Sequence, residues 1–390
     1  MDQQEKALAA HKAWNGKFEI RSRAPLGTRE DLATAYTPGV AAPCLEIRDN
    51  PDKVYDYCRK GNYVAVVTDG SAILGLGNIG PVAGMPVMEG KAILFKEFAD
   101  VDAVPICLGT QDPQEIVRTV ELMAPGFGGI NLEDISAPRC FEVERALTEK
   151  LKIPVFHDDQ HGTAVVVLAA VRNVTRLTGK KLKDLKIVVN GAGAAGNAIT
   201  HLLAAQGVGE IVVVDQQGAL HKDLPDMDPY QQELAALTNP RNLTGSLGDV
   251  IDGADVFIGV SAPGVLTKDM VARMAPQAAV FAMANPVPEI DPEEAREAGA
   301  YIVGTGRSDH PNQINNVLAF PGIFRGALDV RAEKINDAML LAAADAIASM
   351  VSDEQLSPDY VMPDPVAERI APAVAAAVAR AARESGVAGN

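Results

Sequence analysis

The chain has 390 residues, of which 47% are hydrophobic and 22% are charged. This composition is typical of a globular protein with enough apolar material for two or three domains. The formal net charge of −16, together with the lack of lysine or arginine runs, argues against nucleic acid or an anionic membrane as a partner. The same negative field would repel a small dianion, so such a substrate would need a local cation to receive it.

The start of the chain and its cysteines predict a cytoplasmic protein. Residues 1–6 are polar and charged, unlike a signal peptide, and no uncharged apolar stretch reaches the roughly 20 residues of a membrane span. The cysteines form no C-x-x-C pair, which favours free thiols in a reducing compartment over a zinc ribbon.

The first part of the chain predicts helices, strands and a long glycine-rich loop. We expect a short helix over 2–14, a strand over 63–68, the loop from Gly70 to Gly84, strands over 91–95 and 103–108, and a helix over 113–124.

The second part alternates short apolar runs with helical stretches. Helices are predicted over 161–176 and 194–206, and strands over 186–190, 210–215, 255–260, 279–283 and 301–304. Short apolar strands without polar alternation predict a parallel sheet that is covered on both faces. The alanine-rich tail, about 332–385, is predicted to be helical.

These patterns predict an α/β protein in three parts. An N-terminal α/β domain is expected over 1–160, and a Rossmann-type doubly wound parallel sheet over 161–330. A C-terminal helical segment over 331–390 is expected to pack back on the first domain.

A dinucleotide-binding loop is predicted between the strand at 186–190 and the next helix. It reads Gly191-Ala192-Gly193-Ala194-Ala195-Gly196, and Asp215 ends the following strand. The first glycine allows a tight turn, the second a close approach of pyrophosphate, and the third close helix–strand packing. The phosphates would meet the free N–H groups of the helix N-terminus.

Acidic residues in apolar surroundings suggest a site for a hard cation. Glu133, Asp134 and Asp159 could supply oxygen ligands for Mg²⁺ or Mn²⁺. A solvated acidic face, or helix capping by Asp134, is the alternative that composition alone favours. His157 and His161 have the spacing of zinc ligands on a helix, but Pro154 and Gly162 indicate a strand and turn instead.

Two further residues are candidate proton carriers. Lys91 is expected at the start of an apolar strand, where burial and a nearby cation would lower its pKa and make it a usable base. Tyr36 is expected in a loop turn. A lysine whose ammonium reaches solvent and a structural tyrosine remain the alternatives.

Several segments together resemble one family, the malic enzymes in their short bacterial form. The matching segments are Tyr36-Thr37-Pro38-Gly39-Val40, Val67-Thr68-Asp69-Gly70-Ser71, Gly75-Leu76-Gly77-Asn78-Ile79-Gly80, Gly90-Lys91, Asn131-Leu132-Glu133-Asp134, His157-Asp158-Asp159-Gln160-His161-Gly162-Thr163, the dinucleotide loop, Ala284-Asn285-Pro286, Thr305-Gly306-Arg307-Ser308-Asp309 and Asn312-Gln313-Ile314-Asn315-Asn316.

The resemblance implies a reaction and a cofactor set. The reaction is the oxidative decarboxylation of (S)-malate to pyruvate and CO2, with NAD as cofactor, NADP as the alternative, and Mg²⁺ or Mn²⁺. It also implies that the N-terminal domain holds substrate and metal, and that the protein is a homodimer or a larger homo-oligomer.

The resemblance also implies residue roles. It assigns Tyr36 as the general acid, Lys91 as the general base, and Asp158 as the acid that orients Lys91. Glu133, Asp134 and Asp159 would bind the metal, and Asn285, Asn315 and Asn316 would meet substrate or nicotinamide.

One departure from the family concerns substrate binding. Ala72 stands where longer members carry a substrate-binding arginine. We expect backbone N–H groups of the Gly75–Gly80 loop to form an anion nest in its place.

Cofactor choice and the rival functions remain open at this point. Asp215 can bind a ribose hydroxyl but would repel a 2′-phosphate, and Gln216 and Gln217 are neutral, so we expect NAD⁺. Lys222 is the nearest base and the candidate 2′-phosphate partner if NADP⁺ is preferred. A malolactic-type or oxaloacetate-decarboxylating enzyme, an amino-acid dehydrogenase and a non-catalytic nucleotide sensor are the alternatives.

Overall fold

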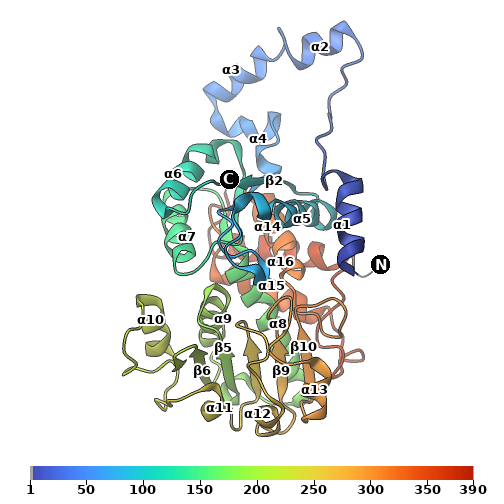
Figure 1. Cartoon of the computed structure of the whole chain (residues 1–390). Coiled ribbons are helices and arrows are strands. Elements are labelled where there is room, and N and C mark those ends of the chain that lie inside the picture. Colours follow the sequence, from blue (N-terminus) through green and yellow to red (C-terminus); the bar gives the residue numbers. More distant parts are fainter. Residues whose placement is uncertain (1–2, 390) are drawn as a thin grey trace.

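The computed structural model describes residues 3–389 and contains two sheets of mainly parallel strands (Figure 1). The first sheet has the order β2-β1-β3-β4, and all of its pairs are parallel. Its strands are β1 (Tyr63–Thr68), β2 (Asp102–Cys107), β3 (Gly129–Leu132) and β4 (Val155–His157). The chain crosses from one side of β1 to the other between β2 and β3, which makes the β1/β3 edge a topological switch point.

Helices cover both faces of this sheet because β1 is apolar on both faces. Val64 and Val66 belong to the core formed with α5 (Pro81–Ala99) and α14 (Phe320–Asp329). The alternate residues, Ala65 and Val67, face the core under α6 (Pro113–Met123) and α7 (Arg139–Lys150).

The strand predicted over 91–95 is wrong, because these residues lie in the middle of α5. The buried positions of α5 include Gly84, Met88, Lys91 and Phe95, which recur every three or four residues. This is the period of one helix face rather than of a strand. Pro86, which lies inside α5, and two glycines concealed the pattern.

The second sheet has the order β10-β9-β8-β5-β6-β7. Its strands are β5 (Lys186–Asn190), β6 (Glu210–Asp215), β7 (Gly218–Ala219), β8 (Val256–Gly259), β9 (Ala279–Ala282) and β10 (Ile302–Thr305). The predicted doubly wound parallel sheet is confirmed; the short edge strand β7, which pairs antiparallel to β6, was not predicted. The switch point of this sheet lies between β5 and β8.

Helices also cover both faces of the second sheet. The helices on one face are α8 (Thr163–Thr178), α9 (Ala194–Ala205) and α15 (Asp337–Ser349), and those on the other are α11 (Leu247–Val250), α12 (Lys268–Ala272) and α13 (Pro292–Glu297). Helix α10 (Pro229–Leu237) stands beside β6 at the edge, and the remaining C-terminal helix is α16 (Ile370–Glu384). The predicted helical tail is therefore two helices, and α16 packs against α14 and α15.

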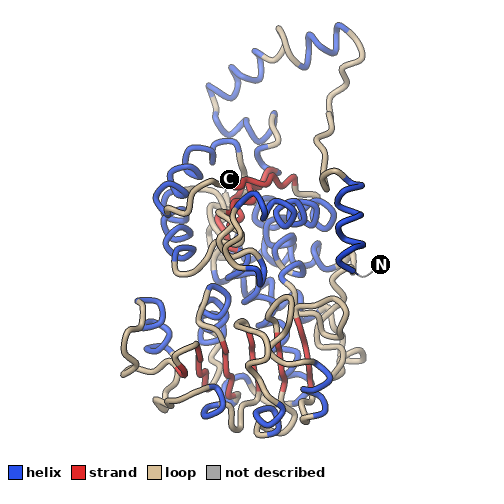
Figure 2. The backbone as a smooth tube through the Cα atoms, in the orientation of Figure 1, coloured by secondary structure: helices blue, strands red, loops and turns tan. Residues whose placement is uncertain are grey.

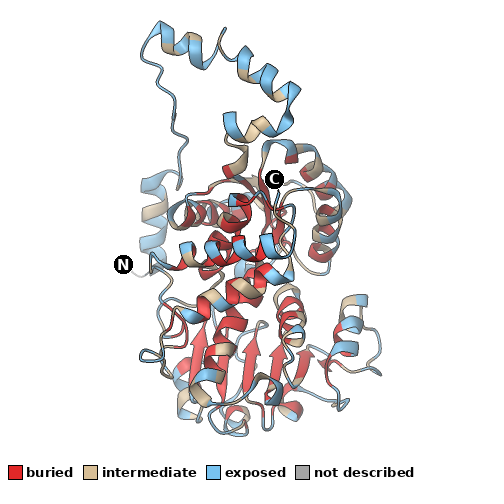
Figure 3. Cartoon of the chain, turned by 180° about the vertical axis from the view of Figure 1, so that it is seen from behind, coloured by how far each residue is buried: buried red, intermediate tan, exposed pale blue. Residues whose placement is uncertain are grey.

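Residues 3–60 stand apart from these layers. Helices α1 (Gln3–Trp14), α2 (Arg29–Ala35), α3 (Ala41–Asp49) and α4 (Val54–Tyr57) have exposed or half-buried side chains throughout the described residues. After α1 the chain rises away from the body, forms α2 and α3, and returns through α4 to β1 (Figure 2). The view from behind shows the same separation, with the buried residues confined to the body (Figure 3).

Short 3-10 turns connect several elements, at Pro51–Lys53, Lys60–Asn62, Leu74–Leu76, Ala124–Gly126, Leu182–Asp184 and Asn316–Leu318. Across residues 3–389, the structure contains no helix that is both long and apolar enough to cross a membrane.

Candidate active site

Acidic residues follow the carboxyl ends of two neighbouring strands in the first sheet. Glu133 and Asp134 come directly after β3, beside the switch point with β1. Asp158 and Asp159 come directly after β4 and begin a π-helical turn (Asp158–Gly162) that leads into α8. Parallel pairing of β3 and β4 brings these carboxylates to one edge of the sheet.

Three of the carboxylates form a group that fits a divalent cation. Oxygen atoms of Glu133, Asp134 and Asp159 all lie within 4.8 Å of one another. The backbone N–H of Asp134 donates to Asp159 Oδ2 at 2.7 Å, and Asp134 Oδ2 is buried without a hydrogen-bond partner. An all-oxygen donor set with an unpaired buried carboxylate oxygen suits Mg²⁺ or Mn²⁺. Asp134 also has a φ of +53°, a strained conformation that fixes its direction.

Burial and mutual repulsion raise the pKa values of these three carboxyl groups. Burial raises the pKa of Asp134 to about 9, with further contributions from the charges of Asp159 and Glu133. Burial also raises the pKa of Glu133 to about 7 and that of Asp159 to about 6. Carboxylates arranged in this way gain from a cation that replaces their protons.

Lys91 faces the same carboxylates from α5. Its Nζ lies 2.5 Å from Asp158 Oδ2, 2.9 Å from Glu133 Oε1 and 4.2 Å from the centre of the Phe320 ring. Burial opposes the charged ammonium, but Asp158, Glu133 and Asp159 outweigh it and raise the pKa of Lys91. The sequence predicted a lowered pKa for Lys91, but the side chains around it raise this pKa instead.

Asp158 is held in place behind Lys91. It is fully buried, and burial raises its pKa to about 6. A Cβ atom at Gly162 would come within 1.9 Å of Asp158 Oδ1, so only glycine leaves room for this carboxylate. On the other side, Asn131 Nδ2 donates to Glu133 Oε2 at 2.8 Å. We assigned no role to Asn131 from the sequence, although it begins a family segment, and we missed Phe320, which belongs to no motif.

The two histidines of this segment differ in their surroundings: the ring of His161 pairs with Glu144, whereas both ring nitrogens of His157 are buried without a hydrogen-bond partner among the described residues, with Nδ1 3.7 Å from Asp159 Oδ2. His161 Nε2 lies 2.9 Å from Glu144 Oε1, and Glu144 Oε1 also accepts from the backbone N–H of His157. Burial lowers the pKa of His157 to about 4, so its imidazole is neutral at physiological pH.

A cavity of about 780 Å³ opens onto Lys91 and the carboxylates. Its lining includes the predicted residues Lys91, Glu133, Asp134, Asp159, Asn285, Asn315 and Asn316. A Cβ atom at Gly75 would lie 1.8 Å from the carbonyl oxygen of Asn285, so loops from the two sheets meet there. The roles predicted for these residues stay predictions, but the fold brings the residues together.

We predicted that the backbone N–H groups of the Gly75–Gly80 loop form an anion nest. Several of these N–H groups are already used in hydrogen bonds within the protein. Those of Leu76, Ile79 and Gly80 donate to carbonyl groups at Ile73, Gly77 and Gly70. The ammonium groups on the cavity lining are instead those of Lys91 and Lys17. Lys17 lies before the first family segment, and sequence reasoning missed it.

Tyr36 is not brought to this cavity. It caps the C-terminus of α2, is 67% exposed, and is not among the cavity's lining residues. Helix α2 lies well above α5 in Figure 1 and remains so in the view from behind. Within one chain, helix α2 therefore lies apart from helix α5.

The glycine loop of the second sheet has the geometry that its spacing predicts. Gly191 has a φ of +120°, and a Cβ atom at Gly196 would lie 1.7 Å from the Gly191 carbonyl oxygen. A Cβ atom at Gly193 would meet nothing within 4 Å, so the backbone there is open to a ligand. The loop sits at the β5/β8 switch point and leads into the N-terminus of α9.

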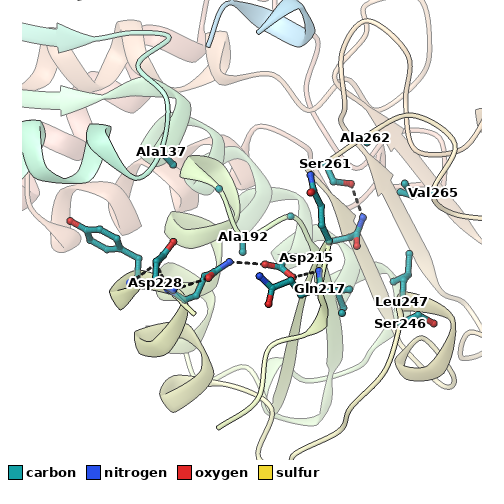
Figure 4. A pocket seen from close by; sticks show the side chains of 18 of the residues that line it. Ala137, Ala192, Asp215, Gln217, Asp228, Ser246, Leu247, Ser261, Ala262 and Val265 are labelled. Atoms are coloured by element: carbon teal, nitrogen blue, oxygen red, sulfur yellow. Dashed lines mark hydrogen bonds between the residues drawn. The ribbon is translucent and has the colours of Figure 1, made fainter. Parts of the chain in front are cut away.

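A second cavity, of about 890 Å³, extends from this loop to Asp215 and Ser261 (Figure 4). Asp215 accepts hydrogen bonds from the backbone N–H of Gln217 at 2.7 Å and from Gln231 Nε2 at 2.6 Å. Within the described residues, the lining contains no lysine or arginine, and Lys222 is not part of it. Gln231, which orients Asp215, carried no signal in the sequence.

The two cavities adjoin. Ala137, Gly193 and Ser261 line both of them. A dinucleotide with its pyrophosphate at the glycine loop would therefore extend toward Lys91 and the carboxylate group.

Comparison with known proteins agrees with this arrangement. Residues 15–148 match the malic enzyme N-terminal domain, and residues 160–383 match the malic enzyme NAD-binding domain. The chain is 59% identical to a bifunctional malic/malolactic enzyme of Bacillus subtilis, over 100% of this chain and 95% of that protein. It is 60% identical to an NAD-dependent malic enzyme of Geobacillus stearothermophilus, over 96% of this chain and 78% of that protein.

A solved structure shows the same likeness. The malic enzyme of Pyrococcus horikoshii superposes with a TM-score of 0.94 at 51% identity, covering 99% of this chain and 92% of that one. The two matched ranges contain β1, β2, β3 and the whole second sheet, while β4, Asp158 and Asp159 lie in the gap between them. The chain belongs to the malic enzyme family.

Proposed function

We propose that this protein oxidises and decarboxylates malate to pyruvate and CO2 while it reduces NAD(P)⁺. The observation that carries the proposal is the meeting of three elements in one cavity. These are the Lys91 ammonium, the carboxylate group of Glu133, Asp134 and Asp159, and the Gly193 end of the dinucleotide site.

Glu133, Asp134 and Asp159 would hold one Mg²⁺ or Mn²⁺. When bound, the cation supplies Lewis acidity at the substrate hydroxyl and a positive charge that offsets the carboxylates beside Lys91, and the nicotinamide supplies the hydride acceptor. Asp158 accepts from the Lys91 ammonium and fixes the direction of that side chain.

Lys91, as the free amine, takes the proton of the C2 hydroxyl while hydride leaves C2. The bond between C3 and the C4 carboxylate then breaks, CO2 leaves, and the electron pair remains as the enolate of pyruvate. Tyr36, which a second copy of the chain in the proposed homodimer would bring to the cavity, donates its phenolic proton to C3, and the Lys91 ammonium returns a proton to the phenolate. The hydroxyl proton thus ends on C3, and both side chains are restored.

Substrate would be held from three sides of the cavity. The amides of Asn285 and Asn315 line it, with Asn316 beside them, and Asn315 Oδ1 is directed by the backbone N–H of Val317 at 2.9 Å. The Lys17 ammonium lines the wall near α5 and supplies the local cation that a dianionic substrate needs in a chain of net charge −16.

The proposed cofactor is NAD⁺ rather than NADP⁺. The carboxylates of Asp215 and Asp228 line the cavity without a lysine or arginine among the described lining residues. A 2′-phosphate there would meet negative charge without a cation to offset it, whereas a ribose hydroxyl can donate to Asp215.

A malolactic reaction is a second candidate because the Bacillus subtilis relative is named for both activities. In that case the same site would retain the cofactor and return the hydride to pyruvate, giving lactate without net NADH. The test incubates the protein with malate and Mn²⁺, with NAD⁺ and NADP⁺ in parallel, and measures reduced cofactor, pyruvate and lactate together.

A homodimer and a cytoplasmic location complete the proposal. The apolar side chains exposed on the first 60 residues and on the start of α5 favour an assembly. The cysteines Cys44, Cys58, Cys107 and Cys140 are all free, which fits a reducing compartment.

A further inference from the structure

Glu144 is a carboxylate beside the active site that the proposed reaction does not use. It lies on α7 next to the turn over Asp158–Gly162, which we call the aspartate turn, and its side chain is 14% exposed. It lines a third cavity, of about 580 Å³, together with Gln160 and His161. Among the described residues, the lining of the cavity that contains Lys91 does not include it. Glu144 therefore lies behind the aspartate turn, away from the proposed substrate.

Glu144 contacts the aspartate turn at both ends. Its Oε1 accepts a hydrogen bond at 3.0 Å from the backbone N–H of His157, the residue directly before the turn. Its Oε2 accepts from Gln160 Nε2 at 3.1 Å, and Oε1 also lies 2.9 Å from His161 Nε2. These partners flank the two aspartates of the turn in the sequence, so one carboxylate clamps both of them.

The aspartate turn needs such a clamp because backbone pairing alone does not hold it. In the described part of the chain, β4 is an edge strand that pairs only with β3, so an N–H directed away from β3 has no strand partner. The turn itself is π-helical, a rare form that occurs mostly as single turns at functional sites. Glu144 supplies the missing acceptor for His157 and a second contact within the turn.

The same turn carries two contacts of the active site. Asp158 Oδ2 accepts from Lys91 Nζ at 2.5 Å, and Asp159 Oδ2 accepts from the backbone N–H of Asp134 at 2.7 Å. Because the two aspartates are consecutive, a shift of the turn changes both contacts at once. A displacement of about 1 Å in a catalytic arrangement can lower the rate by about 10²-fold.

The charge of Glu144 suits this position. Burial opposes ionisation, but the charge of His161 and its hydrogen bond, with smaller contributions from His157, hold the pKa of Glu144 below its usual value. A charged acceptor forms hydrogen bonds roughly twice as strong as those of a neutral acceptor. A carboxylate therefore holds the turn more firmly than an amide in the same place.

We propose that Glu144 is a positioning residue, which clamps the aspartate turn from behind and thereby sets both the affinity for Mg²⁺ or Mn²⁺ and the direction of Lys91. It acts through Asp158 and Asp159. Groups that hold metal ligands in place commonly change metal affinity by about 10- to 100-fold. The inference rests on the proposed function, since the two aspartates act there through the cation and through Lys91.

The test compares Glu144→Gln with Glu149→Gln. Glu149 lies on the same helix, lines the same third cavity and is exposed. Its substitution removes the same charge from that cavity and leaves the contacts of Glu144 in place, so it is the matched control. Calorimetric titration without malate measures Mn²⁺ and NAD⁺ affinity, thermal unfolding measures stability, and steady-state kinetics at saturating Mn²⁺ give kcat and KM.

The clamp predicts that Glu144→Gln binds Mn²⁺ about tenfold more weakly than the wild type. It should also lower kcat at saturating Mn²⁺, with little change in KM for malate or in NAD⁺ affinity. Glu149→Gln should match the wild type in each of these quantities. Wild-type Mn²⁺ affinity in Glu144→Gln, with only a lower Tm, would identify a merely structural residue and overturn the proposal. An equal loss of Mn²⁺ affinity in both variants would overturn it too.

A double substitution tests the route from Glu144 to the cation. If Glu144 acts through Asp159, then Glu144→Gln should weaken Mn²⁺ binding by less than about twofold in a chain that already carries Asp159→Asn. Losses that add in full would contradict this route. The single Asp159→Asn variant provides the reference for the comparison.

A further variant covers the case in which Glu144→Gln does not fold. Gln160→Leu removes one contact of the clamp from the side of the turn, and it should weaken Mn²⁺ binding several-fold. Wild-type affinity in Gln160→Leu would then overturn the proposal. Failure of the proposed function is seen separately, because a wild type that binds Mn²⁺ but makes no pyruvate from malate contradicts that function and leaves the effect of Glu144 on the metal site standing.

Discussion

Lys91 Nζ and Asp158 Oδ2 lie 2.5 Å apart in an ion pair whose carboxylate is fully buried. The pair joins α5 to the end of β4 and fixes the ammonium beside the carboxylate group. A base must be held in one direction to take a proton efficiently, and this contact does so.

We expect Asp158→Asn to lower kcat for malate oxidation by about 10²-fold while it changes KM little, because the amide no longer anchors the Lys91 ammonium. The pH dependence of kcat should shift as well, since Lys91 loses a neighbouring negative charge. Asp102→Asn, which breaks the half-exposed ion pair with Arg59, is the control and should leave both quantities near wild type.

The metal group gives the second prediction. Glu133→Gln, Asp134→Asn and Asp159→Asn should each weaken Mn²⁺ binding by about 10- to 100-fold and remove most turnover. NAD⁺ binding should remain, because the glycine loop lies in the other sheet. Calorimetric titration with Mn²⁺ and with NAD⁺ separates the two effects. A variant that binds Mn²⁺ like the wild type would exclude its residue from the ligand set.

Stability should depend on pH through the same carboxylates. The pKa of Glu133 is raised to about 7 and that of Asp134 to about 9, above the usual value of about 4 in an unfolded chain. From about pH 4, where the carboxyl groups of the unfolded chain ionise, up to the raised pKa values of the folded chain, the folded chain binds more protons than the unfolded chain. The contribution of these carboxyl groups to the free energy of unfolding therefore falls as pH rises.

A bound cation replaces those protons, so the gain in Tm on adding Mg²⁺ or Mn²⁺ to chelator-treated protein should grow between about pH 5 and pH 8. Thermal unfolding with and without the cation measures this gain. The gain should become smaller and less dependent on pH in Asp134→Asn. A gain that is equal at both pH values in the wild type would speak against carboxylate ligation.

Cofactor choice is tested by kcat/KM for NAD⁺ and NADP⁺ at saturating malate and Mn²⁺. We expect NAD⁺ to be preferred, and we expect Gln217→Lys to shift the ratio toward NADP⁺ because it adds a cation beside Asp215. Gln217→Leu is the matched control, since it changes the side chain without adding charge. A wild-type preference of about tenfold or more for NADP⁺ would contradict the assignment.

The sequence predicted the second sheet and its dinucleotide loop well because their signals are local. A strand, three glycines and a helix follow one another over some 20 residues, and the geometry of Gly191 and Gly196 depends on little else. The carboxylate group was also predictable, since Glu133 and Asp159 each follow an apolar strand and carboxyl ends of parallel strands share one edge.

Other features depend on contacts that no local pattern contains. Helix α5 was misread at 91–95 because Pro86 and nearby glycines weaken helix propensity, while its buried face is stabilised by packing against β1, β2 and α14. The position of Tyr36 is not encoded near Tyr36 at all. It depends on whether the segment that contains α2 and α3 packs on its own chain or on another chain.

The separate roles of the proton carriers can be measured in single steps. Lys91→Ala should block malate oxidation, whereas Tyr36→Phe should slow protonation of the enolate more than oxidation. Exchange of the methyl protons of pyruvate with solvent, followed by NMR, reports the second role without hydride transfer. Exchange at the wild-type rate in Tyr36→Phe would refute its assignment as the acid.

The most direct test of the account is the product balance of one reaction containing malate, Mn²⁺ and NAD⁺. We expect equal amounts of NADH, pyruvate and CO2, complete loss of all three on chelation of the metal, and no products from Lys91→Ala. Lactate with no net NADH, or undiminished turnover in the presence of chelator, would contradict oxidative decarboxylation at the Lys91 and carboxylate site.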